Sequence, residues 1–199
     1  MPFDQIVLAF DTSAAHCAAA LLSGDQIITS RVDEMKRGQA EHLFVMLEEV
    51  LAQNDIGWSN LTKIGVGVGP GNFTGIRISV ASARGLALSL GIPAVGVSSL
   101  EVQFTGTPIL ASVEAPRDQV YVQQFGADTA PAALVTVEEA SAQAAALGIP
   151  LGTQLAADAL VREIASRALR SEAQTPPAPL YIRAADAAPP RDPAPVILS

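Results

Sequence analysis

The chain has 199 residues, of which 49% are hydrophobic and 16% are charged, and its formal net charge is −8. This balance excludes an intrinsically disordered chain, and the excess of acid argues against an independent grip on nucleic acid, which needs a basic surface. The length suits one large domain or two small ones. Its single cysteine, Cys17, cannot form an internal disulfide, so we expect a buried thiol in a reducing compartment.

The N-terminal run MPFDQIVLAF has no basic segment and is too short for the apolar core of a signal peptide. The longest apolar candidate for a membrane span is interrupted by Arg84 and by small polar residues. We therefore expect a cytoplasmic protein without contact with the membrane.

The first hundred residues begin with three short strands joined by tight turns, which predicts an antiparallel meander over residues 5–10, 17–22 and 26–32. A helix follows at residues 40–53. Its apolar positions Ala40, Leu43, Phe44, Leu47, Val50 and Leu51 share one face of the helical wheel. Val45 and Met46 fall outside that face, as ordinary surface residues or as part of an association surface.

A strand at residues 64–68 then enters the loop GPGNFTG, and a helix leaves it and runs to residue 90. Two interpretations of the loop stay open, a tight turn without a ligand and a cradle of backbone N–H groups for an anion. The helix has an apolar stripe for the sheet. A second, small-residue face that includes Ile78, Ser82 and Gly85 would let another helix approach closely, from this chain or from a partner.

A short strand at residues 92–97 and a helical turn at 98–104 complete a β-β-β-α-β-α-β order, which predicts an α/β lobe with a mixed sheet. We place the boundary of this lobe at residue 104. The remainder, residues 105–199, is a smaller and shortened C-terminal lobe with a Pro/Ala-rich tail. Its expected elements are strands at 109–113, 119–125 and 134–137 and helices at 138–147 and 155–169. Beyond residue 184 we expect extended or disordered chain.

The chemistry-bearing side chains concentrate after the first strand, at Asp11, Thr12 and Ser13. A carboxylate and two hydroxyls at such a turn can bind Mg²⁺ and phosphate oxygens, or they can cap the local backbone without a ligand. His16 and His42 are the only histidines and have no partner at metal-ligand spacing, so the sequence predicts no metal site.

Four segments together resemble the TsaB (YeaZ) family, and the match is specific at Gly69-Pro70-Gly71-Asn72-Phe73-Thr74-Gly75-Ile76-Arg77. The segments are IVLAFDTSAAHCAAALL, AEHLFVMLEEVL, GVGPGNFTGIRISVASARGLAL and IPAVGVSSLE. The second half resembles the family more weakly, at EAPRDQVY and PLYIR. The resemblance implies a two-lobed actin/sugar-kinase-like (ribonuclease H-like) fold in which each lobe is a mixed β-sheet with helices.

The same resemblance implies a role in forming N6-threonylcarbamoyladenosine in tRNA, as a dimerisation and activating subunit that partners the catalytic paralogue TsaD and the ATPase TsaE. Ser99 and Gln103 stand where TsaD has its two metal-binding histidines. Asp11-Thr12-Ser13 then corresponds to a vestigial phosphate loop. We expect no catalysis by this chain alone, no required cofactor, and contact with tRNA only through the complex.

The interface expected for this role is formed by the two helices of the first lobe, with Val45, Met46, Ile78, Ser82 and Gly85 facing TsaD, or a second copy in its absence. One alternative is a nucleotide-binding enzyme of the actin/kinase (ASKHA) type that holds ATP or ADP through Asp11. A metallopeptidase is a further alternative, which the missing histidines argue against.

Overall fold

The computed structural model describes residues 5–126, 128–173 and 175–182. Its larger sheet has five strands in the order β3-β2-β1-β4-β5. The first three strands pair antiparallel, and β1, β4 and β5 pair parallel. The strands are β1 (Ile6–Asp11), β2 (His16–Ser23), β3 (Gln26–Glu34), β4 (Lys63–Gly67) and β5 (Ala94–Val97).

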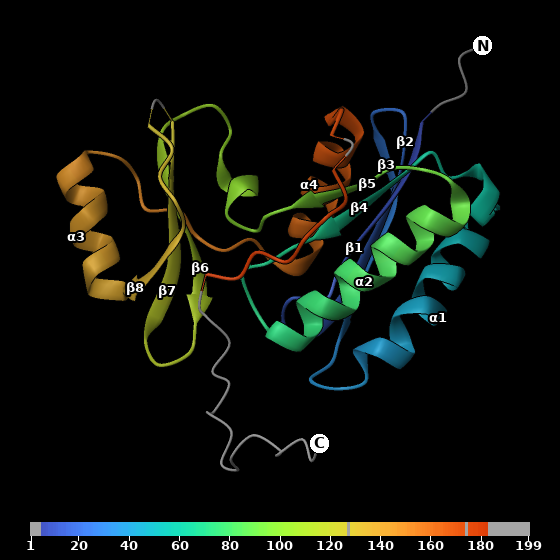
Figure 1. Ribbon diagram of the computed structural model, residues 1–199, viewed down its shortest axis with the longest axis horizontal. Coiled ribbons are helices and arrows are strands. Elements are labelled where there is room, and N and C mark those ends of the chain that lie inside the picture. The colour runs from blue at the N-terminus through green and yellow to red at the C-terminus, as the bar shows by residue number, and fades with distance from the viewer. Residues whose placement is uncertain (1–4, 127, 174, 183–199) are drawn as a thin grey trace, which may run out of the picture.

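Helices cover both faces of this sheet. Helices α1 (Gln39–Ala52) and α2 (Phe73–Leu90) lie side by side on one face, and α4 (Ala157–Arg170) lies on the other (Figure 1). Alternate residues of β1 serve the two layers, because successive side chains of a strand point to opposite faces. Leu8 packs with α1 and α2, and Val7 packs with α4. The two strands β1 and β2 are therefore buried along almost their whole length.

The smaller sheet is antiparallel, in the order β6-β7-β8. Its elements are β6 (Ile109–Ala115), β7 (Gln119–Phe125), β8 (Ala133–Thr136) and α3 (Val137–Leu147). Thr136 and Glu139 form a capping box that starts α3. The predicted two-lobed fold class is confirmed, although among the described residues the strands of the second sheet pair antiparallel and a single isolated bridge, between Leu110 and Leu151, is parallel.

The two sheets lie on either side of the boundary expected after residue 104, but α4 does not follow that division. This helix comes from the second half of the chain and packs on β1, β2 and β4 of the first sheet. Its Ile164 and Ala165 are fully buried there. The first lobe is therefore built from two separate parts of the sequence. Two 3-10 turns, Trp58–Asn60 and Glu101–Gln103, complete the described elements.

The buried face of α1 differs from the predicted one. Met46 is fully buried, whereas Phe44 is 40% exposed and Ala40 is exposed. Two overlapping stripes of apolar residues run through this helix and share Leu43 and Leu47, so the periodicity alone does not fix its rotation. The assignment of Met46 to an association surface was wrong.

Candidate functional site

The glycine-rich loop before α2 packs directly on the loop that follows β1. A Cβ on Gly75 would lie 1.8 Å from the carbonyl oxygen of Thr12, and one on Gly71 would lie 2.3 Å from that of Ser13. Asn72 caps α2 by accepting a hydrogen bond from Gly75 N at 2.9 Å. Thr12 Oγ1 donates to the carbonyl oxygen of Gly75 at 2.7 Å. These glycines therefore serve the close approach of two backbone segments.

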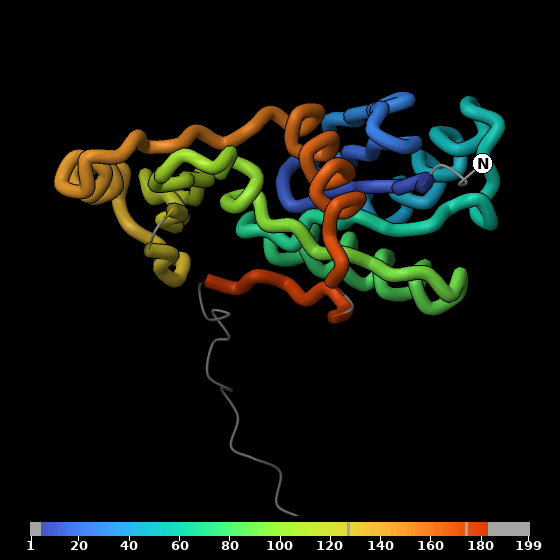
Figure 2. The backbone as a smooth tube through the Cα atoms, turned by 90° about the horizontal axis from the view of Figure 1, so that it is seen from above, coloured from blue at the N-terminus to red at the C-terminus, as the bar shows by residue number. Residues whose placement is uncertain are grey.

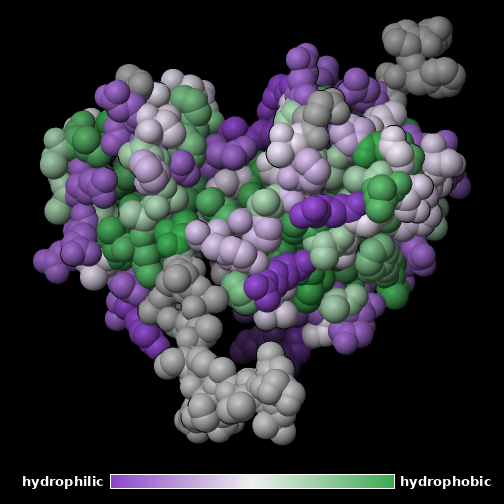
Figure 3. Space-filling view, viewed as in Figure 1, coloured by the Kyte–Doolittle hydropathy of each residue, from purple (hydrophilic) through white to green (hydrophobic). Residues whose placement is uncertain are grey.

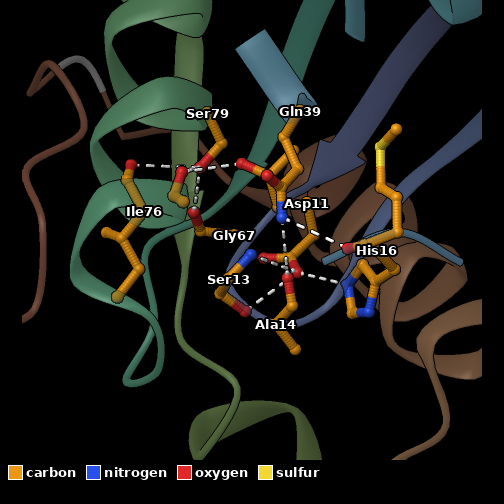
Figure 4. A network of polar contacts seen from close by, with 11 residues as sticks. Asp11, Ser13, Ala14, His16, Gln39, Gly67, Ile76 and Ser79 are labelled. Atoms are coloured by element: carbon orange, nitrogen blue, oxygen red, sulfur yellow. Dashed lines mark hydrogen bonds and ion pairs between the residues drawn. The ribbon is translucent and has the colours of Figure 1, made fainter. Parts of the chain in front are cut away.

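Asp11 stands at the centre of a buried polar cluster, drawn in Figure 4. Its Oδ2 accepts hydrogen bonds from Ser13 N and Ser13 Oγ, both at 2.9 Å, and lies 2.8 Å from His16 Nε2. The tight turn from β1 into β2 brings these residues together. Asp11 Oδ1 is buried and has no hydrogen-bond partner in the part of the chain that the structure describes, and a Cβ on Gly67 would lie 1.9 Å from it. The carboxylate is fully enclosed.

This geometry bears on the magnesium–nucleotide that the fold class implies. A bound Mg²⁺ needs carboxylate oxygens that water and phosphate can reach. Asp11 has no exposed surface, and one of its oxygens already has three polar partners. The residues at Asp11 therefore do not fit that ion. The vestigial phosphate loop stays a prediction, and in this structure Asp11 and Ser13 hold the turn together.

A cleft of about 510 Å³ lies between the two sheets. Its lining includes Ser13, Lys36, Asn72, Ser99, Tyr121 and Gln154. Ser99 is 4% exposed, and its Oγ has no partner among the described residues. The cleft thus brings the predicted phosphate loop to one wall and β6–β7 to the other.

Ser99 and Gln103, the two positions matched to metal-binding histidines, have different environments. Ser99 lines the cleft, whereas the Gln103 amide is held by backbone groups on both sides. Burial raises the pKa of the neighbouring Glu101. Glu101 does not line the cleft but lines two other pockets together with Arg167. Across the described parts of the chain, His, Cys, Asp and Glu form no group of three or more that could hold a metal ion.

The outer face of α1 and α2, which we call the α1–α2 face, carries apolar and small residues. Leu88 is 86% exposed, Val45 is 50% exposed, and a Cβ on Gly85 would meet nothing within 4 Å. Ser82 and Ile78 are half-buried beside them, and Ile78 also packs on the core. Figure 3 shows green, apolar residues interspersed with white and purple ones over both helices on the side turned to the viewer. The structure thus brings four of the five predicted interface residues to this face.

A shallower groove continues this face at the end of α2. It has a volume of about 620 Å³ and is lined by Arg84, Leu88, Ile92, Pro93, Pro176 and Pro177. Sequence reasoning missed Leu88 and Phe44 as exposed apolar residues. Leu88 could have been found from its place three residues beyond Gly85 on the same helix face. None of the helices in the described residues has the length and apolar content to cross a membrane.

The fold and cleft define a class of protein: a two-lobed α/β protein of the actin-like and ribonuclease H-like type. The family model described as TsaD, tRNA N6-adenosine threonylcarbamoyltransferase, matches residues 27–185. The chain therefore belongs to this family, as one of its TsaB (YeaZ) members.

The individual relatives agree with this assignment. The chain is 36% identical over 128 residues to the tRNA threonylcarbamoyladenosine biosynthesis protein TsaB of Buchnera aphidicola subsp. Schizaphis graminum, covering 61% of this chain and 60% of that protein. It is 37% identical over 123 residues to TsaB of Bacillus subtilis, covering 58% and 52%. The chain thus spans about three fifths or less of the length of these curated relatives.

The solved structure of YeaZ from Pseudomonas aeruginosa has the same fold. Its TM-score is 0.67 at 24% identity, and the match covers 89% of this chain and 99% of that one. A Pseudomonas aeruginosa protein described as similar to the peptidase YeaZ has a TM-score of 0.70, also at 24% identity, covering 90% and 100%. At this identity the likeness shows the fold alone.

Proposed function

We propose that the chain is a non-catalytic dimerisation and activating subunit of the complex that forms N6-threonylcarbamoyladenosine in tRNA. In this proposal a TsaD paralogue carries the transfer chemistry, TsaE joins as the ATPase, and tRNA is reached through the complex in the cytoplasm. The family membership and the TsaB relatives support the pathway. The observation that carries the subunit role is the α1–α2 face, where Val45, Gly85 and Leu88 are exposed outside the core.

The partner that this face fits is a pair of helices with its own small and apolar outer residues. Gly85 allows close approach of a helix backbone, and Val45 and Leu88 supply apolar area on either side. The equivalent helices of TsaD are the proposed occupant. A second copy of this chain would occupy the face when TsaD is absent.

The proposed lack of catalysis by this chain alone draws support from two side chains. The Asp11 carboxylate is enclosed and engaged by Ser13 and His16. The Gln103 amide is engaged by backbone groups. Neither group can reach a substrate in the cleft without first giving up these contacts.

The alternative function is a nucleotide-binding enzyme of the actin/kinase type. Two features of the cleft favour it, namely its volume and the buried Ser99 hydroxyl, which has no hydrogen-bond partner among residues 5–126, 128–173 and 175–182. Titration calorimetry of the isolated chain with ATP and with ADP separates the two. No heat of binding is expected, and micromolar binding accompanied by turnover would replace our proposal with the alternative. A metallopeptidase is less well supported, and stoichiometric zinc or iron in the purified protein would revive it.

The subunit role is tested by Ser82→Arg in co-expression with the TsaD paralogue. We expect co-purification to be lost while the melting temperature of the isolated chain stays nearly unchanged, because surface substitutions usually alter stability by less than about 0.5 kcal/mol. The matched control is Ala145→Arg on the exposed side of α3, which should leave co-purification intact. A large drop in melting temperature for Ser82→Arg would show that this position is internal.

A further inference from the structure

The connection between β5 and β6, residues 98–108, contributes buried side chains to the cores of both lobes. Leu100 is fully buried among residues of the second sheet, including Ala111 and Val113. Two residues later, Val102 is buried in the layer between the first sheet and α4. Arg167 of α4 donates to the carbonyl oxygen of Phe104 at 2.7 Å. This connection is therefore held by both lobes.

Gln103 cross-links this connection to β6. Its Nε2 donates to the carbonyl oxygen of Ser112 at 2.7 Å and to that of Ser99 at 3.1 Å. Its Oε1 accepts from Ser112 N at 3.1 Å. A side-chain amide has two donor hydrogens and one acceptor oxygen, so every polar atom of Gln103 is used. The Gln103 amide bonds both the backbone N–H and the carbonyl oxygen of Ser112, as a neighbouring strand would. These two bonds fix the position and the orientation of the amide relative to β6.

The returning chain packs closely against the amide of Gln103. A Cβ on Gly152 would lie 2.2 Å from Gln103 Oε1, so a larger residue at position 152 would displace the amide from its hydrogen bonds. Ser112 Oγ donates to the carbonyl oxygen of Gly152 at 2.6 Å, and Gly152 N donates to that of Leu110 at 2.8 Å. The segment that returns from α3 to α4 thus closes over the amide and is itself tied to β6.

Residues 180–182 form a second link between the two lobes. Leu180 packs on the core beneath α1 and α2, and its N donates to the carbonyl oxygen of Val68 at 2.9 Å. Ile182 packs against the cluster of Leu100, Ala111 and Val113 in the second lobe. Figure 2 shows the corresponding segment, in red, passing from the first lobe toward the second.

Tyr181, between these two anchors, is clamped to the start of α2. Its hydroxyl accepts from Arg77 Nε at 2.9 Å, and its ring centroid lies 5.0 Å from that of Phe73. The Arg77 guanidinium carbon also lies 3.8 Å from the centroid of Phe73. The clamp is partly exposed and adds nothing to either core, so its effect is to hold residues 180–182 in place across the two lobes.

We propose that Gln103 and residues 180–182, together the interlobe ties, hold the two lobes at one fixed angle. Gln103 is then a positioning residue, and the cleft keeps a constant width instead of opening and closing. This inference concerns the isolated chain and does not depend on the proposed pathway. It assigns a structural task to an amide that the proposed function leaves unused.

The test is the distance distribution between two spin labels, measured by pulsed electron paramagnetic resonance on the full chain. Labels are attached at Gln53→Cys beyond α1 and at Gln143→Cys on α3, both exposed. The native Cys17 is fully buried, which keeps the label from it. We expect one narrow distribution in the doubly labelled parent, and roughly twofold broadening when Gln103→Ala is added.

The matched control is Gln123→Ala, which also removes a side-chain hydrogen bond to backbone but only within the second lobe. It should leave the distribution narrow. Because Gln103→Ala risks unfolding, Tyr181→Ala, at a partly exposed position, provides an independent test and should also broaden the distribution. A broad distribution in the parent, or narrow distributions in folded Gln103→Ala and Tyr181→Ala, would overturn the proposal.

Discussion

Helices α2 and α4 cover opposite faces of the same sheet, yet their outer surfaces differ. The outer side of α4 carries charges that pair within the helix, as Asp158 does with Arg162. The outer side of α2 carries Gly85 and Leu88, and neighbouring α1 adds Val45. A helix that meets only water needs polar outer residues, whereas one that is covered again does not. The contrast supports α4 as a solvated face and the α1–α2 face as an association surface.

The inner sides of the two helices should be equivalent, since each fills one layer of the core. Ile164→Ala and Ile76→Ala are each expected to lower the free energy of unfolding by about 2–5 kcal/mol, because both remove a buried side chain and leave a cavity. Urea unfolding followed by circular dichroism measures this. If Ile76→Ala costs under about 1 kcal/mol while Ile164→Ala costs the full amount, α2 is not an equal part of the core.

The outer sides of α2 and α4 should differ in their contribution to binding of TsaD. Leu88→Ser is expected to weaken binding to TsaD by roughly tenfold, about 1.4 kcal/mol, through loss of apolar contact. Its stability in isolation should hardly change, since Leu88 is already exposed. Calorimetry or surface plasmon resonance provides the dissociation constants. Unchanged affinity for Leu88→Ser would remove the end of α2 from the interface.

The corresponding change on α4 is Arg162→Ala, which breaks the ion pair with Asp158. It should lower the free energy of unfolding by no more than about 0.5 kcal/mol, because exposed pairs between residues four apart contribute little. Affinity for TsaD should stay at the parent value. An affinity loss as large as that of Leu88→Ser would contradict the assignment of α4 as a solvated face.

The chemical reactivity of the Cys17 thiol shows whether α1 separates from the sheet that it covers. Burial, reinforced by the charges of Asp33 and Asp11, raises the pKa of the Cys17 thiol to about 11. At pH 8 its reactive thiolate is therefore on the order of a hundredfold rarer than in an unfolded chain. We expect Ellman's reagent to label the native protein only at the rate of opening, and to label it at once in urea. Rapid labelling of the folded protein would show that α1 does not seal this side of the sheet.

The smallest expected effect concerns acid stability at the margin of α1. Burial raises the pKa of Asp33, but hydrogen bonds from Arg31 and His42 outweigh it, and the net pKa lies below its ordinary value. The associated stabilisation is thus present above about pH 4 and is lost as the pH falls through the lowered pKa. Because Asp33 is partly exposed and solvent screens its ion pairs, Asp33→Asn should remove no more than about 0.5 kcal/mol of this stabilisation.

This effect is measured by urea unfolding at several pH values between neutral and strongly acidic conditions. The control is Asp25→Asn in the exposed turn between β2 and β3. It should leave the pH dependence as it is in the parent. Identical pH profiles for the parent and Asp33→Asn would contradict the account of this ion-pair cluster.

The succession of strands and helices along the chain followed from the sequence because turn signals and periodicity mark these elements strongly. Asn72 and the glycines of GPGNFTG fixed the start of α2. Met46 was misplaced because two apolar stripes overlap on α1, and the choice between them depends on how the helix meets β2. The packing of α4 on the first sheet was missed because no local pattern shows which of two sheets an amphipathic helix covers.

The site was predictable in part. The turn at Asp11 was found, but the pairing of Asp11 with His16 depends on the register of the β1–β2 hairpin. The cross-link by Gln103 had no sequence signal, because glutamine occurs in many settings and its partners are backbone groups. Val45 and Gly85 are exposed as the helical wheel predicted, and their part in an interface stays a prediction.

The central claim, that the α1–α2 face and not the α4 face binds the partner, is tested most directly by amide hydrogen exchange of this chain with and without TsaD. The account predicts that exchange in α1 and α2 slows by roughly tenfold or more in the complex, while α4 exchanges as it does in the isolated chain. Protection of α4 with no change in α1 and α2 would contradict it.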